Sequence, residues 1–95
     1  MYVLRIRGGY KMEIRAGKVT HYYDRIGVAV LILFEELEVG DTIHIHGKLT
    51  DLTQRVASME IEHQKIQSAG PKTEIALKVL EPVREGDTIY KIMEE

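Results

Sequence analysis

Short apolar runs that alternate with polar residues are the feature that most constrains the fold of this chain. Met12, Ile14 and Ala16 alternate with charged residues, and Ile43 and Ile45 alternate with polar ones. An alternation of period two is typical of a strand with one buried face. No segment keeps an apolar stripe at helical spacing, so we predict strands and no substantial helix. The predicted strands span residues 11–16, 28–33, 42–46, 56–63, 75–79 and 88–92.

Turn residues separate these runs. The sequence Asp24-Arg-Ile-Gly27 links two strands at hairpin distance, and Gly27 can adopt positive φ there. The sequence Gly-Asp-Thr-Ile occurs twice, at residues 40–43 and 86–89. In each copy we expect the glycine to take the left-handed corner, the aspartate to accept a backbone N–H, and the Thr-Ile pair to start a strand. The repeat indicates either internal pseudo-symmetry or one favourable turn used twice, and we favour the second interpretation.

The spacing of the strands predicts a closed barrel or a sandwich in a single domain of 95 residues. Val56 and Met59 both have the character of core residues, but their spacing breaks the alternation. A β-bulge at Ala57-Ser58 would place Val56, Met59 and Ile61 on one face. The predicted core comprises Val19, Val28, Val30, Ile32, Ile43, Ile45, Val56, Met59, Ile61, Ile75, Leu77 and Val79.

Composition restricts where the chain works and what it binds. There are no cysteines, which excludes disulfides and thiol chemistry and favours a cytoplasmic location. The N-terminus lacks the apolar segment of a secretion signal, and the longest apolar run, residues 28–34, is too short to span a membrane. The net charge of −2 argues against a general polycation, so we expect no DNA partner. Positive charge is nevertheless concentrated in residues 1–25, which hold six Lys or Arg and two acidic residues.

Catalytic signatures are absent from the sequence. It contains no phosphate-binding loop, no dinucleotide glycine motif, no nucleophile elbow and no metalloprotease motif. We therefore expect a protein that is not an enzyme and needs no cofactor. His44 and His46 lie two residues apart on a predicted strand, a spacing that can bind a metal if further ligands are present. We favour two solvent-facing polar side chains and predict no metal site.

The strongest candidate for a binding surface is the segment Lys18-Val-Thr-His-Tyr-Tyr-Asp-Arg25. Aromatic faces beside cations can stack on unpaired bases, and Tyr and Arg are common at protein interfaces. We therefore predict that Lys18, Tyr22, Tyr23 and Arg25 contact the partner. The alternative is that one of the two tyrosines packs into the core, since tyrosine is an ordinary strand residue.

Several of these motifs occur together in the order of a known family. The ordered set resembles the second β-barrel domain of translational GTPases such as elongation factor Tu, over about residues 12–92. The motifs are Gly17-Lys-Val, Ile26-Gly-Val-Ala29, Leu37-Glu-Val-Gly-Asp-Thr-Ile43, Val56-Ala-Ser-Met59, Ala69, Ile75-Ala-Leu77 and Glu85-Gly-Asp-Thr-Ile-Tyr90. The resemblance implies a single antiparallel Greek-key β-barrel of six or seven strands over residues 11–95, preceded by an extension at residues 1–10 that we expect to be poorly ordered or dispensable.

The same resemblance implies a function. The first function that it implies is that of a non-catalytic binding module associated with RNA or the translation machinery. Lys72 and Ala76 depart from the family, which often has glycine at these places, and no GTPase domain precedes the barrel. No site residue carries over from the family. A related barrel is also an accessory domain of collagenase-like peptidases, so the alternative is a protein-interaction subunit that supplies such a barrel in trans to an enzyme. The oligomeric state stays open.

Overall fold

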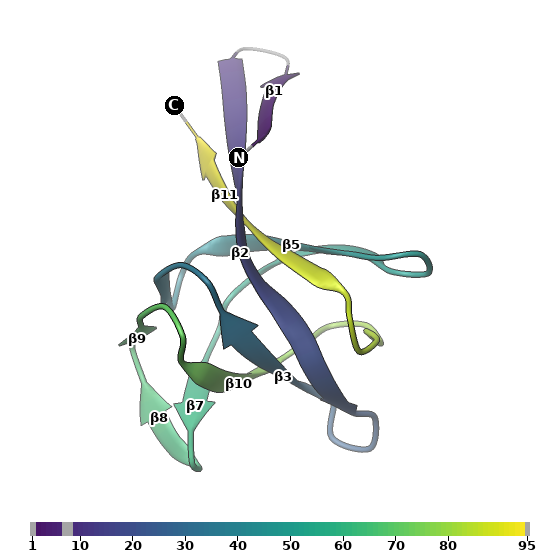
Figure 1. Ribbon diagram of the computed structural model, residues 1–95, viewed down its shortest axis with the longest axis vertical. Helices are drawn as coiled ribbons and strands as arrows, with labels where there is room; N and C mark the ends of the chain where they lie inside the picture. The colour runs from purple at the N-terminus through teal and green to yellow at the C-terminus, as the bar shows by residue number, and fades with distance from the viewer. Residues whose placement is uncertain (1, 7–8, 95) are drawn as a thin grey trace.

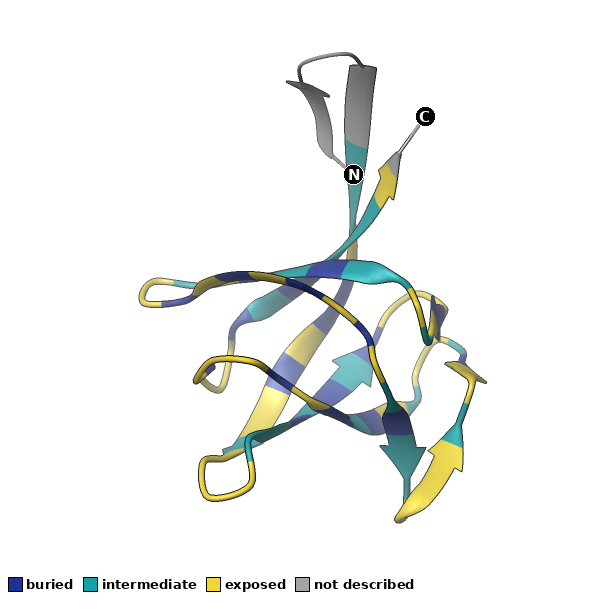
Figure 2. Ribbon diagram, turned by 180° about the vertical axis from the view of Figure 1, so that it is seen from behind, coloured by how far each residue is buried: buried dark blue, intermediate teal, exposed yellow. Residues whose placement is uncertain are grey.

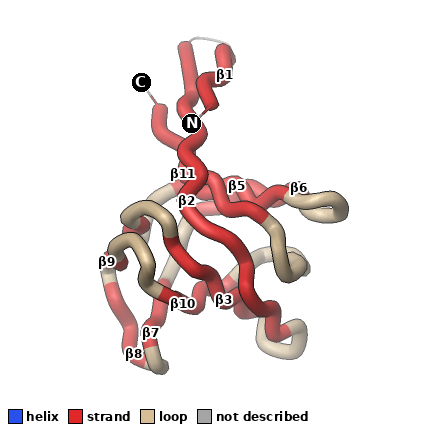
Figure 3. The backbone as a smooth tube through the Cα atoms, viewed as in Figure 1, coloured by secondary structure: helices blue, strands red, loops and turns tan. Residues whose placement is uncertain are grey.

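The computed structural model describes residues 2–6 and 9–94, with the side chains of residues 12–93. Every regular element in this part of the chain is a strand, and every strand pair is antiparallel (Figure 3). In the same residues, no helix is long and apolar enough to cross a membrane. The prediction of an all-β, antiparallel fold is confirmed. The strands are β1 (Tyr2–Ile6), β2 (Gly9–Tyr23), β3 (Val28–Leu33), β4 (Leu37–Glu38), β5 (Thr42–His46), β6 (Asp51–Arg55), β7 (Met59–Ile61), β8 (Gln64–Ile66), β9 (Ser68–Ala69), β10 (Glu74–Lys78) and β11 (Thr88–Glu94).

One sheet makes up most of the molecule. Its strands are paired in the order β6, β5, β11, β2, β3, β10, β7 and β8, with β1 added to β2, while β4 and β9 form a separate short pair. Figure 1 shows that this sheet curves around the interior and that the β1–β2 hairpin projects from one end. The long strand β2 runs through both parts, so it connects the projecting hairpin to the curved sheet.

The predicted closed barrel of six or seven strands is not confirmed. Among the strands described, β6 and β8 end the hydrogen-bonded order and do not pair with each other. A side chain bridges part of the opening that these unpaired strands leave in the sheet. The amide of Gln54, on β6, donates from Nε2 to the carbonyl oxygen of Lys78 at 2.9 Å and accepts at Oε1 from the backbone N–H of Leu80 at 2.8 Å. Gln54 is 6% exposed, so a buried amide links β6 to the end of β10 where backbone pairing is missing.

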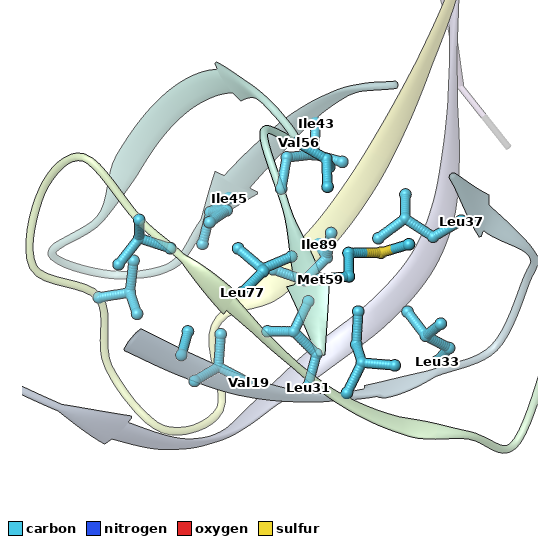
Figure 4. Close-up of a cluster of buried hydrophobic side chains, with 14 of the residues drawn as sticks. Val19, Leu31, Leu33, Leu37, Ile43, Ile45, Val56, Met59, Leu77 and Ile89 are labelled. Carbon is cyan, nitrogen blue, oxygen red and sulfur yellow. The ribbon is translucent and has the colours of Figure 1, made fainter. Parts of the chain in front are cut away.

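The concave side of the sheet holds a single apolar core (Figure 4). Eight of the twelve predicted core residues are buried, including Ile43, Ile45 and Leu77. The other four are half-buried: Val28, Val30, Ile32 and Ile61. Three of these belong to β3, where the core face is formed by Ala29, Leu31 and Leu33. The prediction chose the wrong face of β3 because both faces of this strand are apolar, so the alternation carried no information.

The two Gly-Asp-Thr-Ile turns have the predicted geometry. Gly40 and Gly86 have φ of 99° and 91°. Asp41 Oδ2 accepts from the backbone N–H of Glu38, and Asp87 Oδ2 accepts from that of Arg84, each at 2.8 Å. The turns lead into β5 and β11, which pair with each other. Thr42 lies opposite Ile92, and Thr88 lies opposite His46. The two copies of the turn therefore precede opposite ends of one antiparallel strand pair, as in an arrangement with local two-fold symmetry.

Other predicted boundaries are corrected. The predicted strand 56–63 is shorter, because β6 ends at Arg55 and β7 begins at Met59. The three residues between them break the sheet instead of forming a bulge within one strand, and this places both Val56 and Met59 in the core. Strand β6 itself was missed, since its inward positions are Leu52 and the polar Gln54.

The N-terminal segment was predicted to be an extension over residues 1–10. Residues 1 and 7–8 lie outside the described residues. The rest forms β1 and the start of β2, paired from Tyr2 opposite Glu13 to Ile6 opposite Gly9. Whether this hairpin is dispensable stays a prediction.

Candidate binding surface

The four residues of the predicted binding surface do not share one face. The pairing of β2 with β3 shifts between Val19 and His21, so the alternation resumes one residue later. Tyr22 is half-buried and packs against the core, whereas Tyr23 is 49% exposed. Lys18 and Arg25 are exposed. The alternative in which one tyrosine packs inward is therefore the observed arrangement, and partner binding by Lys18, Tyr23 and Arg25 stays a prediction.

Tyr23 is held in place by its neighbours on the outer face. Its ring lies 4.2 Å from the ring of His21, measured between centroids, at an interplanar angle of 59°. His21 Nδ1 in turn lies 3.3 Å from Glu85 Oε1. Both of these side chains are largely exposed, so this contact orients Tyr23 without burying it.

A groove of about 840 Å³ lies on the outer face of the sheet, beside Tyr23. Figure 1 shows that the β7–β8 hairpin and the turn between β2 and β3 lie at the same end of the molecule, away from the β1–β2 hairpin. Both contribute to the groove, and the outer faces of β3 and β10 form its floor. The lining residues are Tyr23, Ile26, Val28, Val30, Ser58, Glu60, Ile61, Glu62, His63, Lys65, Glu74, Ile75, Ala76, Leu77 and Lys78.

Strand register explains why these residues meet. His21 lies opposite Val30, Val30 opposite Ala76, Ala76 opposite Glu60 and Glu60 opposite Lys65. Side chains opposite each other in an antiparallel pair share a face of the sheet, so these five form one row across β2, β3, β10, β7 and β8. The central side chains of the row, Val30 and Ala76, are small and apolar, whereas Glu60 and Lys65 at one end are charged. In Figure 2 most of β8 is coloured as exposed.

The charged residues of the groove are mostly acidic. Glu60, Glu62 and Glu74 carry carboxylates, while Lys65 and Lys78 carry ammonium groups. None of these five has an ion-pair partner among the side chains of residues 12–93. The groove therefore presents charges that the rest of the described chain does not neutralise.

The turn at the edge of the groove has a strained backbone. Glu62 and His63 connect β7 to β8 and have φ of 47° and 65°. Two successive left-handed residues form the type I′ turn that suits a two-residue hairpin, but asparagine and glycine are the usual occupants. A left-handed conformation costs roughly 1–2 kcal/mol for each ordinary residue. This turn places the side chains of Glu62 and His63 at the groove, where glycine would be less strained.

His44 and His46, for which two solvent-facing side chains were favoured over a metal site, differ in their surroundings, and His44 is half-buried beside two carboxylates. His44 Nδ1 lies 3.1 Å from Glu13 Oε1, and His44 Nε2 lies 2.6 Å from Asp51 Oδ1. The two carboxylates face opposite nitrogens of one ring, so they cannot share an ion with it. No group of three or more potential ligands suited to a metal is present among the described residues. His46 contacts His44 only through its ring, with centroids 5.4 Å apart. His44 thus connects side chains of β2, β5 and β6.

The groove was missed in the sequence. Its floor residues Val28 and Val30 were assigned to the core, and Glu60 and Ala76 had no assigned role. One signal was available: the run Val28 to Leu33 is apolar at every position. In a single curved sheet with its core on one side, the second apolar face has to lie on the outer surface.

The sequence is similar to parts of longer proteins that are named as proteases. No family model matches the sequence. An uncharacterized protease of Methanocaldococcus jannaschii is 36% identical over 83 residues, which covers 86% of this chain and 20% of that protein. A collagenase of Porphyromonas gingivalis is 35% identical over 86 residues, covering 88% of this chain and 21% of the collagenase. The chain therefore spans about a fifth of the length of the curated relatives it matches.

Solved structures agree with these relatives. The C-terminal domain of a Geobacillus thermoleovorans protein described as a U32 peptidase superimposes with a TM-score of 0.77 at 21% identity. The match covers 93% of this chain and 97% of that one. Its selenomethionine variant gives a TM-score of 0.76 at 22% identity. At this identity the comparison establishes the fold.

The resemblance to the second domain of translational GTPases is therefore wrong, as is the first reading of a translation-factor-like, RNA-binding module. The relatives are named as proteases, and the similar structures are peptidase C-terminal domains. The motifs that carried the resemblance, such as Gly27 and the two Gly-Asp turns, form turns and strand starts. Such residues specify a fold and can be common to proteins of different function.

Proposed function

We propose that this chain is a non-catalytic accessory domain that works beside a peptidase and supplies a protein-binding surface to it. The observation that carries the proposal is the extent of the sequence matches. They take in most of this chain but only about a fifth of each protease, and the same fold was solved separately as a C-terminal domain. In these relatives the matched segment is part of a protein named as a protease, and we infer that this domain likewise serves a peptidase.

The chemistry of the described side chains supports a role without catalysis. Acyl transfer requires a nucleophile within hydrogen-bond reach of a base. Among residues 12–93, His21 and His44 have near contacts with carboxylates, and no serine or threonine hydroxyl is hydrogen-bonded to a histidine. The sequence has no cysteine. We infer that peptide hydrolysis belongs to the partner.

The fold suits a rigid accessory domain. We infer that the curved sheet acts as a small barrel in which the Gln54 amide, instead of a backbone ladder, joins β6 to the end of β10. Binding residues on a rigid scaffold lose little conformational entropy when a partner docks.

The experiment is affinity capture with a tagged form of the full chain, expressed in its native cells and treated with or without RNase. The expected result is a peptidase chain that co-purifies in both conditions and that re-forms the complex from purified components. The purified chain alone is expected to leave fluorescent casein intact. Capture that disappears with RNase, or casein hydrolysis that survives re-purification, would contradict the proposal.

A further inference from the structure

We propose that the outer groove binds an extended polypeptide segment, with a bulky apolar side chain over Ala76 and a basic side chain among Glu60, Glu62 and Glu74. The inference rests on the proposed function in taking the partner to be a polypeptide. The shape, the apolar floor and the charge of the groove support the kind of segment that we propose.

The floor of the groove is an apolar sheet surface that the described chain leaves uncovered. Val28 and Val30 lie on the outer face of β3 and are half-buried, with their core-side neighbours Ala29 and Leu31 fully buried. Ala76 lies opposite Val30 on β10. Its single methyl group leaves a hollow between Val30 and Glu60, its two cross-strand neighbours. A hollow with apolar surroundings is suited to a bulky apolar side chain.

The walls of the groove favour a narrow, extended occupant. One wall is formed by Tyr23 and Ile26, which are 49% and 62% exposed. The other is the β7–β8 hairpin with its strained turn at Glu62 and His63. The register places the first wall at the Lys78 end of β10 and the second at the Glu74 end, so the groove runs between them. The volume of about 840 Å³ accommodates a few residues of extended chain but not a folded domain.

The charge of the groove selects a basic segment. Pairing between β7 and β10 consists of Met59 with Leu77 and Glu60 with Ala76. Continuing that register would place Glu62 across from Glu74, with Glu60 next to them. Like charges at neighbouring positions destabilise a sheet, and these have no ion-pair partner among the side chains of residues 12–93. A cation from a partner would neutralise this corner.

The same charges disfavour nucleic acid. Nucleic-acid sites neutralise phosphates with Lys and Arg, whereas the groove has three carboxylates and two ammonium groups. Lys65 and Lys78 lie on the outer strand β8 and at the end of β10. Glu60 on β7 lies between Lys65 and β10, so the two lysines do not form a continuous track for a phosphate backbone.

The test uses a fluorescein-labelled peptide with the sequence Ser-Lys-Ser-Lys-Phe-Lys-Ser-Lys-Ser and the full chain, followed by fluorescence polarisation. The expected result is saturable binding with a Kd in the micromolar range, about 1–100 μM. Replacement of the phenylalanine by serine is expected to weaken binding about tenfold, as is Ala76→Arg, which fills the hollow. Ile26→Ser, at an exposed turn position, is a second variant that tests the wall if Ala76→Arg lowers stability.

Glu74→Lys and Glu81→Lys form the matched pair for the charge argument. Both positions are exposed, and each change raises the net charge of the chain by two. Glu81, however, lies outside the groove. Glu74→Lys is expected to weaken peptide binding about fivefold or more, and Glu81→Lys to change it less than about twofold. Equal effects would indicate general attraction to the acidic domain and overturn the site.

Three further outcomes overturn the inference: no saturable binding, binding unaffected by both Ala76→Arg and Ile26→Ser, or a single-stranded oligouridine that binds the groove and is displaced by the peptide. The proposed function fails independently. If the peptide binds as expected but no peptidase is captured, the accessory role is wrong and the groove assignment stands. If a peptidase is captured and Ala76→Arg and Glu74→Lys leave both measurements unchanged, the accessory role stands and the groove assignment is wrong.

Discussion

Replacing Gln54 by methionine removes the amide that joins β6 to the end of β10. The side chain keeps its length, so no large cavity forms and the effect reports mainly the two short hydrogen bonds, since the third, from Nε2 to the carbonyl oxygen of Arg55, is 3.4 Å long. One runs from Gln54 Nε2 to the carbonyl of Lys78, at 2.9 Å, and one from the N–H of Leu80 to Gln54 Oε1, at 2.8 Å. A net hydrogen bond contributes about 1 kcal/mol, and a buried polar group left unpaired costs about 1–3 kcal/mol.

These magnitudes give the expected loss of stability. Two hydrogen bonds account for about 2 kcal/mol, and the unpaired carbonyl adds up to about 1 kcal/mol. The N–H of Leu80 also loses its acceptor, but the residue as a whole is 77% exposed, so we add no separate penalty for it. We expect Gln54→Met to lower the free energy of unfolding by about 2–3 kcal/mol, which corresponds to a fall in Tm of roughly 10–20 °C for a domain of this size.

Guanidinium denaturation followed by circular dichroism measures this change, with thermal melting as a second readout. The matched control is Gln64→Met on β8, where the glutamine is exposed. The control is expected to stay within about 0.5 kcal/mol of the unchanged protein. A Gln54 variant as stable as the Gln64 variant would refute the reasoning, because it would mean that the amide does not hold β6 in place.

Two further predictions test the packing. Gly47→Ala places a methyl group against the carboxylate of Asp87, which has to move and weaken its bond to the preceding turn, so we expect a loss of about 1–3 kcal/mol. Gly70→Ala has nothing within 4 Å of the new methyl group and serves as its control in the same denaturation experiment, where equal losses would contradict the clash. Leu31→Ala in the core is expected to cost about 2–5 kcal/mol, and Ile32→Ala on the outer face less than half as much. Comparable losses from these two variants would contradict the assigned face of β3.

Local chemistry made the turns predictable. Gly27, Gly40 and Gly86 were assigned positive φ from their place between strands, and all three have it. Each assignment needed only a few consecutive residues, because a turn is specified by the backbone freedom of glycine and by the short side chain of aspartate. The strands with polar outer faces, such as β5, were equally accessible, since one apolar face leaves a single way to orient the strand.

The site could not be predicted because it is assembled by pairing between distant strands. Val30, Ala76 and Glu60 become neighbours only through the register of β3, β10 and β7. Their local sequences are ordinary strand sequences, and none of them contains a binding motif. Tyr22 and Tyr23 show the same limit, since a shift in pairing at His21 decides which ring faces outward. A bulge in a long strand leaves no clear mark in composition or periodicity.

The position of β11 has a consequence for the order in which the domain folds. This strand is the last in sequence of those described, yet it lies between β5 and β2 within the sheet. During synthesis, β2 and β5 therefore each keep one unpaired edge until residues 88–94 have left the ribosome. Contacts between residues so far apart in sequence slow folding, and open strand edges can associate with other chains. We expect folding of the described sheet to be a cooperative event that requires β11.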